Sequence, residues 1–179
     1  LGGGAIAAGG GGMALGLFST LIIGLIIKQI GSFFPATVVG AFFIKIGQFL
    51  TVLTGAGIAA GVANSLGAPK LVLYSVFVPG LVGAYASAFN AGSLISAAGA
   101  VTLSGPGDPL GALVAALAAA EIGRLVSGRT KVDIIITPAV TILVGCLVGF
   151  LLGPPLAAAS KAIGVFINYA TDLQPFFMG

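Results

Sequence analysis

Two long stretches of this chain, residues 71–107 and 134–160, contain no charged side chain. In the whole chain, 58% of the residues are hydrophobic and only 6% are charged. A soluble globular domain has about 25% charged residues, because its surface must face water. A helix that crosses a bilayer needs roughly 20 mainly apolar residues, and both stretches are long enough. The sequence therefore predicts an integral membrane protein.

The chain also contains 30 glycines, an unusual number for a helical protein. In water each glycine inside a helix costs about 1 kcal/mol, whereas membrane helices tolerate glycine and use it to bring backbones together. Gly57 and Gly61 form a GxxxG pair, which favours helix packing. We therefore expect closely packed helices rather than a simple anchor.

The apolar runs and the turns between them predict an all-α fold, a polytopic transmembrane helical bundle of about five spans plus re-entrant or interfacial segments. The predicted spans cover residues 13–30, about 47–67, 71–98, 110–126 and 133–152. Pro79 and Gly80 predict a kink or break in the third span. The sequence Gly-Pro-Pro at 153–155 predicts the end of the fifth span, before an amphipathic or shorter helix over 156–169. A sixth span is expected to begin near Phe176.

Two segments allow more than one interpretation. Residues 1–12 are either a loop or a helix end in tight contact with a neighbour. Residues 36–67 form either one tilted helix or a short interfacial helix followed by a span from about Gly47, and Lys45 favours the second. Because the chain begins at Leu1 and ends in an apolar run, residues 1–179 are expected to be a single membrane domain, the N-terminal part of a longer protein.

Several function classes are excluded by the residues that the sequence lacks. Without any histidine, neither a Ser/His/Asp nor a Cys/His catalytic set can form. Cys146 is the only cysteine, so metal-binding spacings are missing, and the sequence has no nucleotide-binding GxxxxGK[ST] loop. The basic residues are scattered, which argues against nucleic acid as a partner. We expect no catalytic residue, metal site or cofactor.

The most informative polar pattern lies on the fifth predicted span, where one face repeats every four residues. This face could pack against a neighbouring helix, since its glycines form a doubled GxxxG pattern, and Asp133 would then be the N-cap residue of its own helix. Alternatively, Asp133 and Thr137 line a polar cavity, and Pro138 supports this because it leaves the Ile134 carbonyl without its helical donor. The face comprises Asp133, Thr137, Thr141, Gly145, Gly149 and Gly153.

Three further polar residues are candidates for binding a solute. Asp108 is either the N-cap of the fourth span or part of a re-entrant loop whose helix N-terminus faces a solute. Glu121 either pairs with Arg124 at the interface or acts as a functional acid within the membrane. Asn90 bonds either to another helix or to a solute, since an unpaired amide in lipid costs several kcal/mol. The predicted substrate-binding residues are Asn90, Asp108, Glu121, Asp133 and Thr137.

Three sequence segments resemble a known family. They read GPGDPLGA at 105–112, EIG at 121–123 and KVDIIITP at 131–138. The chain resembles the membrane IIC component of the bacterial sugar phosphotransferase system, in the divergent branch that includes perfringolysin regulator-type membrane proteins. The resemblance covers most of the chain. A GITEP-like segment and histidine, which carry the family's usual sugar-binding Glu and His, are missing from it.

This resemblance implies a homodimeric, multi-pass transporter of the bacterial cytoplasmic membrane that binds a sugar near the middle of the bilayer. It also implies cytoplasmic IIB and IIA components, of which IIB phosphorylates the sugar. Two alternatives stay open. One is a membrane-embedded regulator or sensor on the same scaffold without transport, and the other is an ion-coupled transporter of another family, with Asp133 and Glu121 on the ion path.

Overall fold

The computed structural model describes residues 2–103, 105 and 107–178, and it describes side-chain surroundings within residues 10–172. Its helices are α1 (Gly2–Leu17), the π-helical turn η1 (Phe18–Ile22), α2 (Ile23–Ser32), α3 (Val38–Val52), α4 (Thr54–Ser65), α5 (Lys70–Ser75), α6 (Phe77–Asn90), α7 (Pro109–Val126) and α8 (Asp133–Met178). Among the described residues, four helical segments are long and apolar enough to cross a membrane, or five if the bent pair α3 and α4 is one span. The predicted all-α, polytopic helical bundle is confirmed.

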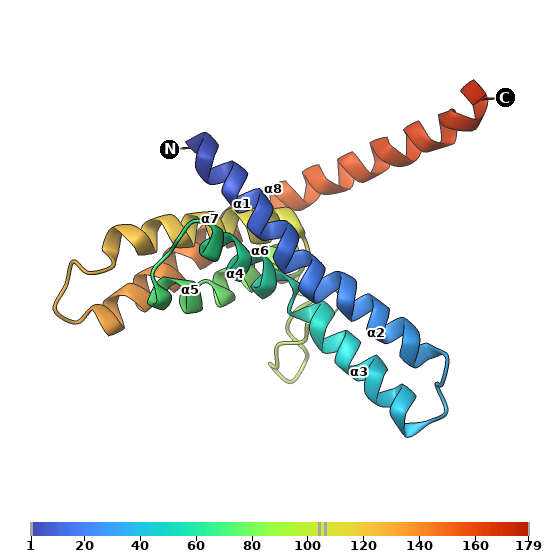
Figure 1. Cartoon of the computed structure of the whole chain (residues 1–179), viewed down its shortest axis with the longest axis horizontal. Helices are drawn as coiled ribbons and strands as arrows, with labels where there is room; N and C mark the ends of the chain where they lie inside the picture. The colour runs from blue at the N-terminus through green and yellow to red at the C-terminus, as the bar shows by residue number, and fades with distance from the viewer. Residues whose placement is uncertain (1, 104, 106, 179) are drawn as a thin grey trace.

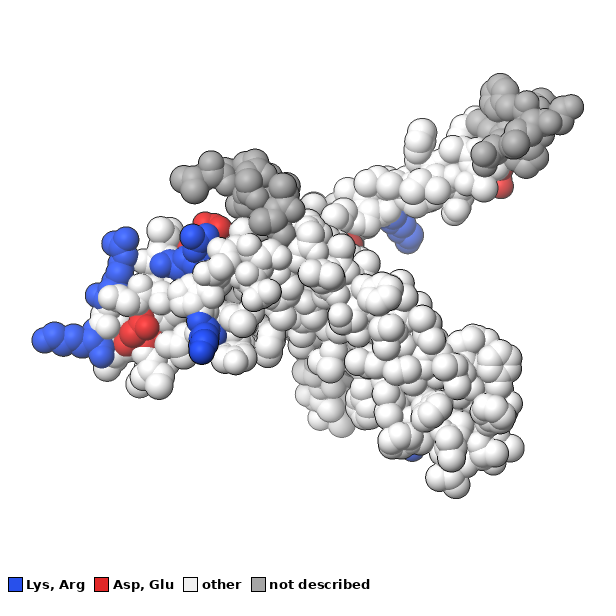
Figure 2. All heavy atoms as spheres, in the orientation of Figure 1, with Lys and Arg blue, Asp and Glu red and all other residues white. Residues whose placement is uncertain are grey.

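Two arms leave a central bundle (Figure 1). The bundle consists of α4, α5, α6, α7 and the first half of α8. One arm is the antiparallel pair α2 and α3, and the other is the second half of α8, which extends away alone (Figure 1). Lys and Arg side chains gather at the opposite end of the bundle, where α7 turns into α8 (Figure 2). The bundle therefore has a basic end and an end from which the arms project.

Glycine contacts hold α1 against α4. A Cβ atom on Gly12 would collide with the Gly61 carbonyl, and one on Gly16 would collide with the Gly57 carbonyl. The predicted packing role of Gly57 and Gly61 is confirmed. The glycine-rich N-terminal segment is a helix rather than a loop over residues 2–12, and it touches its neighbour tightly at Gly12.

Small residues also join α6, α7 and α8. The buried face of α7 is formed by alanines at 112, 115, 116, 119 and 120, all with no exposed surface. Opposite them, an added Cβ on Gly145 would lie 2.6 Å from the Ala119 Cβ, and one on Gly149 would lie 3.0 Å from the Ala115 Cβ. The repeating face of α8 is therefore a packing seam from Thr137 to Gly153.

The predicted stop at residues 153–155 is wrong, because α8 runs through it without a break. A proline inside a helix removes a donor and its ring crowds the carbonyl four residues earlier, at about 3 kcal/mol, so the helix continues only where other contacts hold it. Gly153 supplies such a contact, since its backbone lies directly against the Ala86 side chain of α6. The helix expected over 156–169 and the start of the sixth span near Phe176 thus both belong to α8, and the side-chain surroundings at Phe176 lie outside the described residues.

Two other predicted boundaries are displaced. The break after α3 falls at Leu53, where the chain bends by 52°, and not near Gly47. The third span breaks at Val76 and not at Pro79, because Pro79 cannot donate to the Ser75 carbonyl and so lies in the first turn of a new helix. This span also ends at Asn90, well before residue 98, and residues 91–103 form a loop with one β-bridge between Ile95 and Val101.

Candidate functional site

Asp108 begins α7 as its N-cap residue, as one of the two sequence interpretations predicted. Its carboxylate accepts hydrogen bonds from the backbone N–H groups of Leu110 at 3.3 Å and Gly111 at 3.1 Å. Its own N–H donates to the Ala84 carbonyl of α6 at 2.8 Å. Gly107, just before it, has a φ of 75° and lies against Ala84, where a side chain would not fit. This end of α7 is therefore fixed firmly on α6.

A residue far along the chain completes the surroundings of Asp108. The Ser160 hydroxyl of α8 donates to the Asp108 carboxylate at 3.0 Å, although 52 positions separate the two residues. The neighbouring Lys161 lines the same pocket, which has a volume of about 480 Å³. The pocket therefore combines a carboxylate, hydroxyls and an ammonium group in a chain that is otherwise poor in such groups. Its lining comprises Ala84, Tyr85, Ser87, Ala88, Gly107, Asp108, Pro109, Ala157, Ser160 and Lys161.

Tyr85 forms the wall between this pocket and a second one. Its hydroxyl donates to the Gly105 carbonyl and lies 3.2 Å from the Val52 carbonyl, at the break between α3 and α4. One phenol proton serves two carbonyl groups that regular helix bonds do not satisfy. Tyr85 thus ties the loop before α7 to the bend at Leu53.

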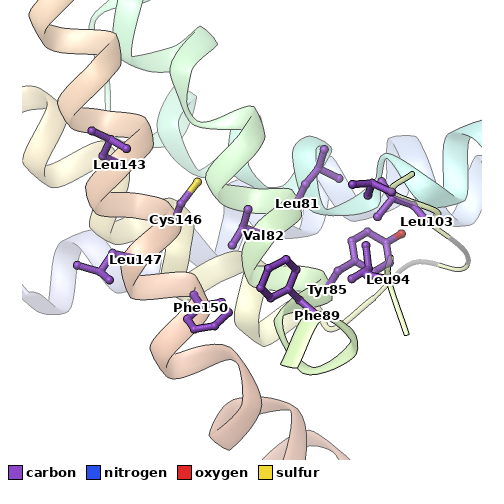
Figure 3. A pocket seen from close by; sticks show the side chains of 11 residues that line it. Leu81, Val82, Tyr85, Phe89, Leu94, Leu103, Leu143, Cys146, Leu147 and Phe150 are labelled. Atoms are coloured by element: carbon purple, nitrogen blue, oxygen red, sulfur yellow. The ribbon is translucent and has the colours of Figure 1, made fainter. Parts of the chain in front are cut away.

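The second pocket is apolar and lies between α6, α8 and the loop at 91–103 (Figure 3). Its volume is about 580 Å³, and its walls include Phe89, Leu143, Cys146 and Phe150. Phe89 and Phe150 meet edge to face, with their ring centroids 5.3 Å apart. A solute rich in hydroxyl groups would lose hydrogen bonds in such surroundings, so the Asp108 pocket suits it better.

Glu121, Asp133 and Thr137 lie at the basic end of the bundle. Glu121 is exposed and pairs with Arg124 at 3.4 Å, and side-chain exposures of 49% and 44% make this a weak surface ion pair. Asp133, the first residue of α8, accepts hydrogen bonds from the Gly128 N–H at 2.8 Å and from the Thr137 hydroxyl. Thr137 has no exposed surface. The Asp133 carboxylate therefore stabilises the turn between α7 and α8.

The five predicted binding residues therefore form two groups. Asn90, exposed at the last position of α6, shares the arm end of the bundle with Asp108. The other three lie toward the basic end. Glu121 is 13 residues from Asp108, about 20 Å along the axis of α7, and Asp133 and Thr137 lie near the end of this helix, whose 18 residues span about 27 Å. No single small solute can contact both groups at once. Their roles in binding remain predictions.

Ser160, Lys161, Ser87 and Tyr85 were not predicted as site residues. The contact between Ser160 and Asp108 depends on α8 continuing past Pro155, and the sequence predicted a stop there. A usable signal was nonetheless present, because Ser160 and Lys161 lie on one face of the helix that was expected to be amphipathic. Among the described residues, no group of three His, Cys, Asp or Glu side chains could hold a metal ion.

Comparison with protein families gives one match, to the family described as "Phosphotransferase system, EIIC", over residues 8–179. The match covers both the bundle and the two arms. Comparison with curated proteins and with solved structures gives no match.

Proposed function

We propose, on the premise that this chain belongs to the phosphotransferase system EIIC family, that it carries a sugar across the bacterial cytoplasmic membrane. Membership of the family and the apolar helices make the chain a multi-pass membrane protein of the phosphotransferase permease type. The sugar, the direction of transport and the particular membrane belong to the proposal.

The observation that supports sugar binding most directly is the contact between Asp108 and Ser160. A carboxylate has about four lone-pair sites, and two backbone N–H groups and a serine hydroxyl occupy three of them, so one stays free for a further donor. Hydrogen bonds from sugar hydroxyls to a charged acceptor are stronger than those to neutral acceptors. Lys161 lines the same pocket, and its ammonium group adds a hydrogen-bond donor. We place the sugar in this pocket, with Asn90 beside its rim.

The partners that we propose follow from the family. A cytoplasmic IIB component would phosphorylate the sugar and a IIA component would supply IIB, since this chain has no histidine that could carry a phosphoryl group. A homodimer is the assembly that the resemblance to this family implies, and we propose it for this chain.

Uptake into membrane vesicles tests this function. Vesicles that contain the full-length protein should accumulate labelled hexoses or hexitols, and the product should be the sugar phosphate when a IIB component that carries a phosphoryl group is added. Vesicles prepared without the protein are the control. If a sugar binds but is never taken up, the chain is a sensor rather than a permease. Uptake that depends on an ion gradient alone would indicate an ion-coupled transporter.

A further inference from the structure

The second half of α8 carries a polar stripe that begins in the Asp108 pocket. On a helix, residues three and four positions apart share a face, and at 100° per residue this stripe fills an arc of about 120°. The stripe consists of Ser160, Lys161, Gly164, Asn168, Thr171 and Asp172. Ser160 and Lys161 line the pocket, so the stripe leads directly outward from it.

The opposite face of the same helix is apolar. It includes Ile163, Phe166 and Tyr169, which are all exposed, with Phe166 at 69%. A membrane would cover such a face with lipid. Lipid does not cover the polar stripe in the same way, because an amide or carboxylate in lipid costs several kcal/mol unless it meets water or a polar partner.

The stripe also has free space at the middle of its length, at Gly164. A Cβ atom added to Gly164 would meet no heavy atom within 4 Å, so the absence of a side chain leaves free space next to Lys161. Helix packing does not explain this glycine, in contrast to Gly145 and Gly149, which lie directly against neighbouring residues. From Ser160 to Asp172 the stripe extends for about 18 Å along the helix axis.

We propose that this face of α8 is the wall of a water-filled path along which the solute reaches the Asp108 pocket. Asn168, Thr171 and Asp172 offer amide, hydroxyl and carboxylate groups at intervals of one helical turn or less. Such groups exchange hydrogen bonds readily with a neutral, hydroxyl-rich solute. The path rests on the proposed function, because it carries the same solute to the same site.

Thiol labelling tests the path without any measurement of transport. In the full-length protein with Cys146→Ala, single cysteines would replace Gly164 and Asn168 on the stripe and Ile163 and Phe166 on the apolar face. A membrane-impermeant maleimide should modify the stripe positions at least about tenfold faster, because only thiols in water ionise and react. Equal rates on the two faces, or faster reaction on the apolar face, would overturn the proposal.

A steric block separates a solute path from a helix that merely lies at the membrane surface. Gly164→Trp should reduce sugar uptake by at least about tenfold, because the indole would fill the free space at Gly164 through which the solute is proposed to pass. Phe166→Trp on the opposite, lipid-facing side is the matched control and should keep uptake near that of the parent. If both variants transport normally, the stripe faces water but is not the path. If the parent transports no sugar, the proposed function fails, and the labelling pattern alone decides whether the stripe faces water.

Discussion

At the scale of single residues, Tyr85 shows how the chain satisfies polar groups in an apolar bundle. A helix break such as the one at Leu53 leaves carbonyl groups without helical donors, and in lipid each of these costs several kcal/mol. The Tyr85 hydroxyl reaches the carbonyl groups of both Val52 and Gly105. The bend between α3 and α4 and the loop before α7 therefore depend on one side chain.

Replacing Tyr85 with phenylalanine is expected to destabilise the protein by about 1–3 kcal/mol, because it leaves these acceptors without a donor. Hydrogen exchange should become faster in the loop at 91–103 and near Leu53. Tyr74→Phe is a matched control, since the Tyr74 side chain is exposed. Unchanged exchange at both segments in Tyr85→Phe would show that the hydroxyl does not hold them.

The separation of the two polar groups is also a residue-scale result. The sequence left two interpretations open for each of two residues, and the structure has Asp108 as a helix cap and Glu121 paired with Arg124. They did not reveal that Ser160 lies beside Asp108, because local periodicity carries no information about contacts between distant segments. The candidate site could therefore be predicted only in part.

At the scale of elements, the sequence predicted which segments are helical and which faces pack. Apolar length identifies helices in a membrane chain, and a four-residue glycine repeat marks a contact face. The ends of helices were harder to predict. Proline at 154 and 155 stops most helices in water, but α8 continues because Gly153 packs on α6 and lipid favours intact helical hydrogen bonds.

The crossing of α6 and α7 offers a direct test of this packing. Gly83 and Gly111 face each other so closely that a Cβ on either would collide with the carbonyl group of the other. Gly83→Ala is expected to cost about 3 kcal/mol or more, because backbone must move to admit the methyl group.

Gly164→Ala serves as the control for this substitution, since a Cβ there meets open space and alanine favours the helix. Thermal unfolding in detergent would compare the two variants. A Gly83→Ala protein as stable as the parent would contradict the close crossing.

At the scale of the whole molecule, the chain has two chemically different ends. The basic end carries the turn at 127–132, and by the positive-inside rule its Arg and Lys residues are expected to face the cytoplasm (Figure 2). The Asp108 pocket lies at the other end, about 27 Å away along α7. On the proposed function, a IIB component would meet the basic end, so a sugar bound in the Asp108 pocket would have to move relative to the membrane before its phosphorylation.

The central claim is that the solute binds at Asp108, and equilibrium binding to the purified protein in lipid nanodiscs tests it most directly. The probe is the labelled hexose or hexitol with the highest uptake, and the variants are Asp108→Asn and Glu121→Gln. Asparagine is as good an N-cap as aspartate, so the first variant should fold normally. We predict that Asp108→Asn weakens binding about 10- to 100-fold, the value of one charge-assisted hydrogen bond, while Glu121→Gln stays within about twofold. Normal binding by Asp108→Asn together with a loss in Glu121→Gln would contradict the claim and move the site to the basic end.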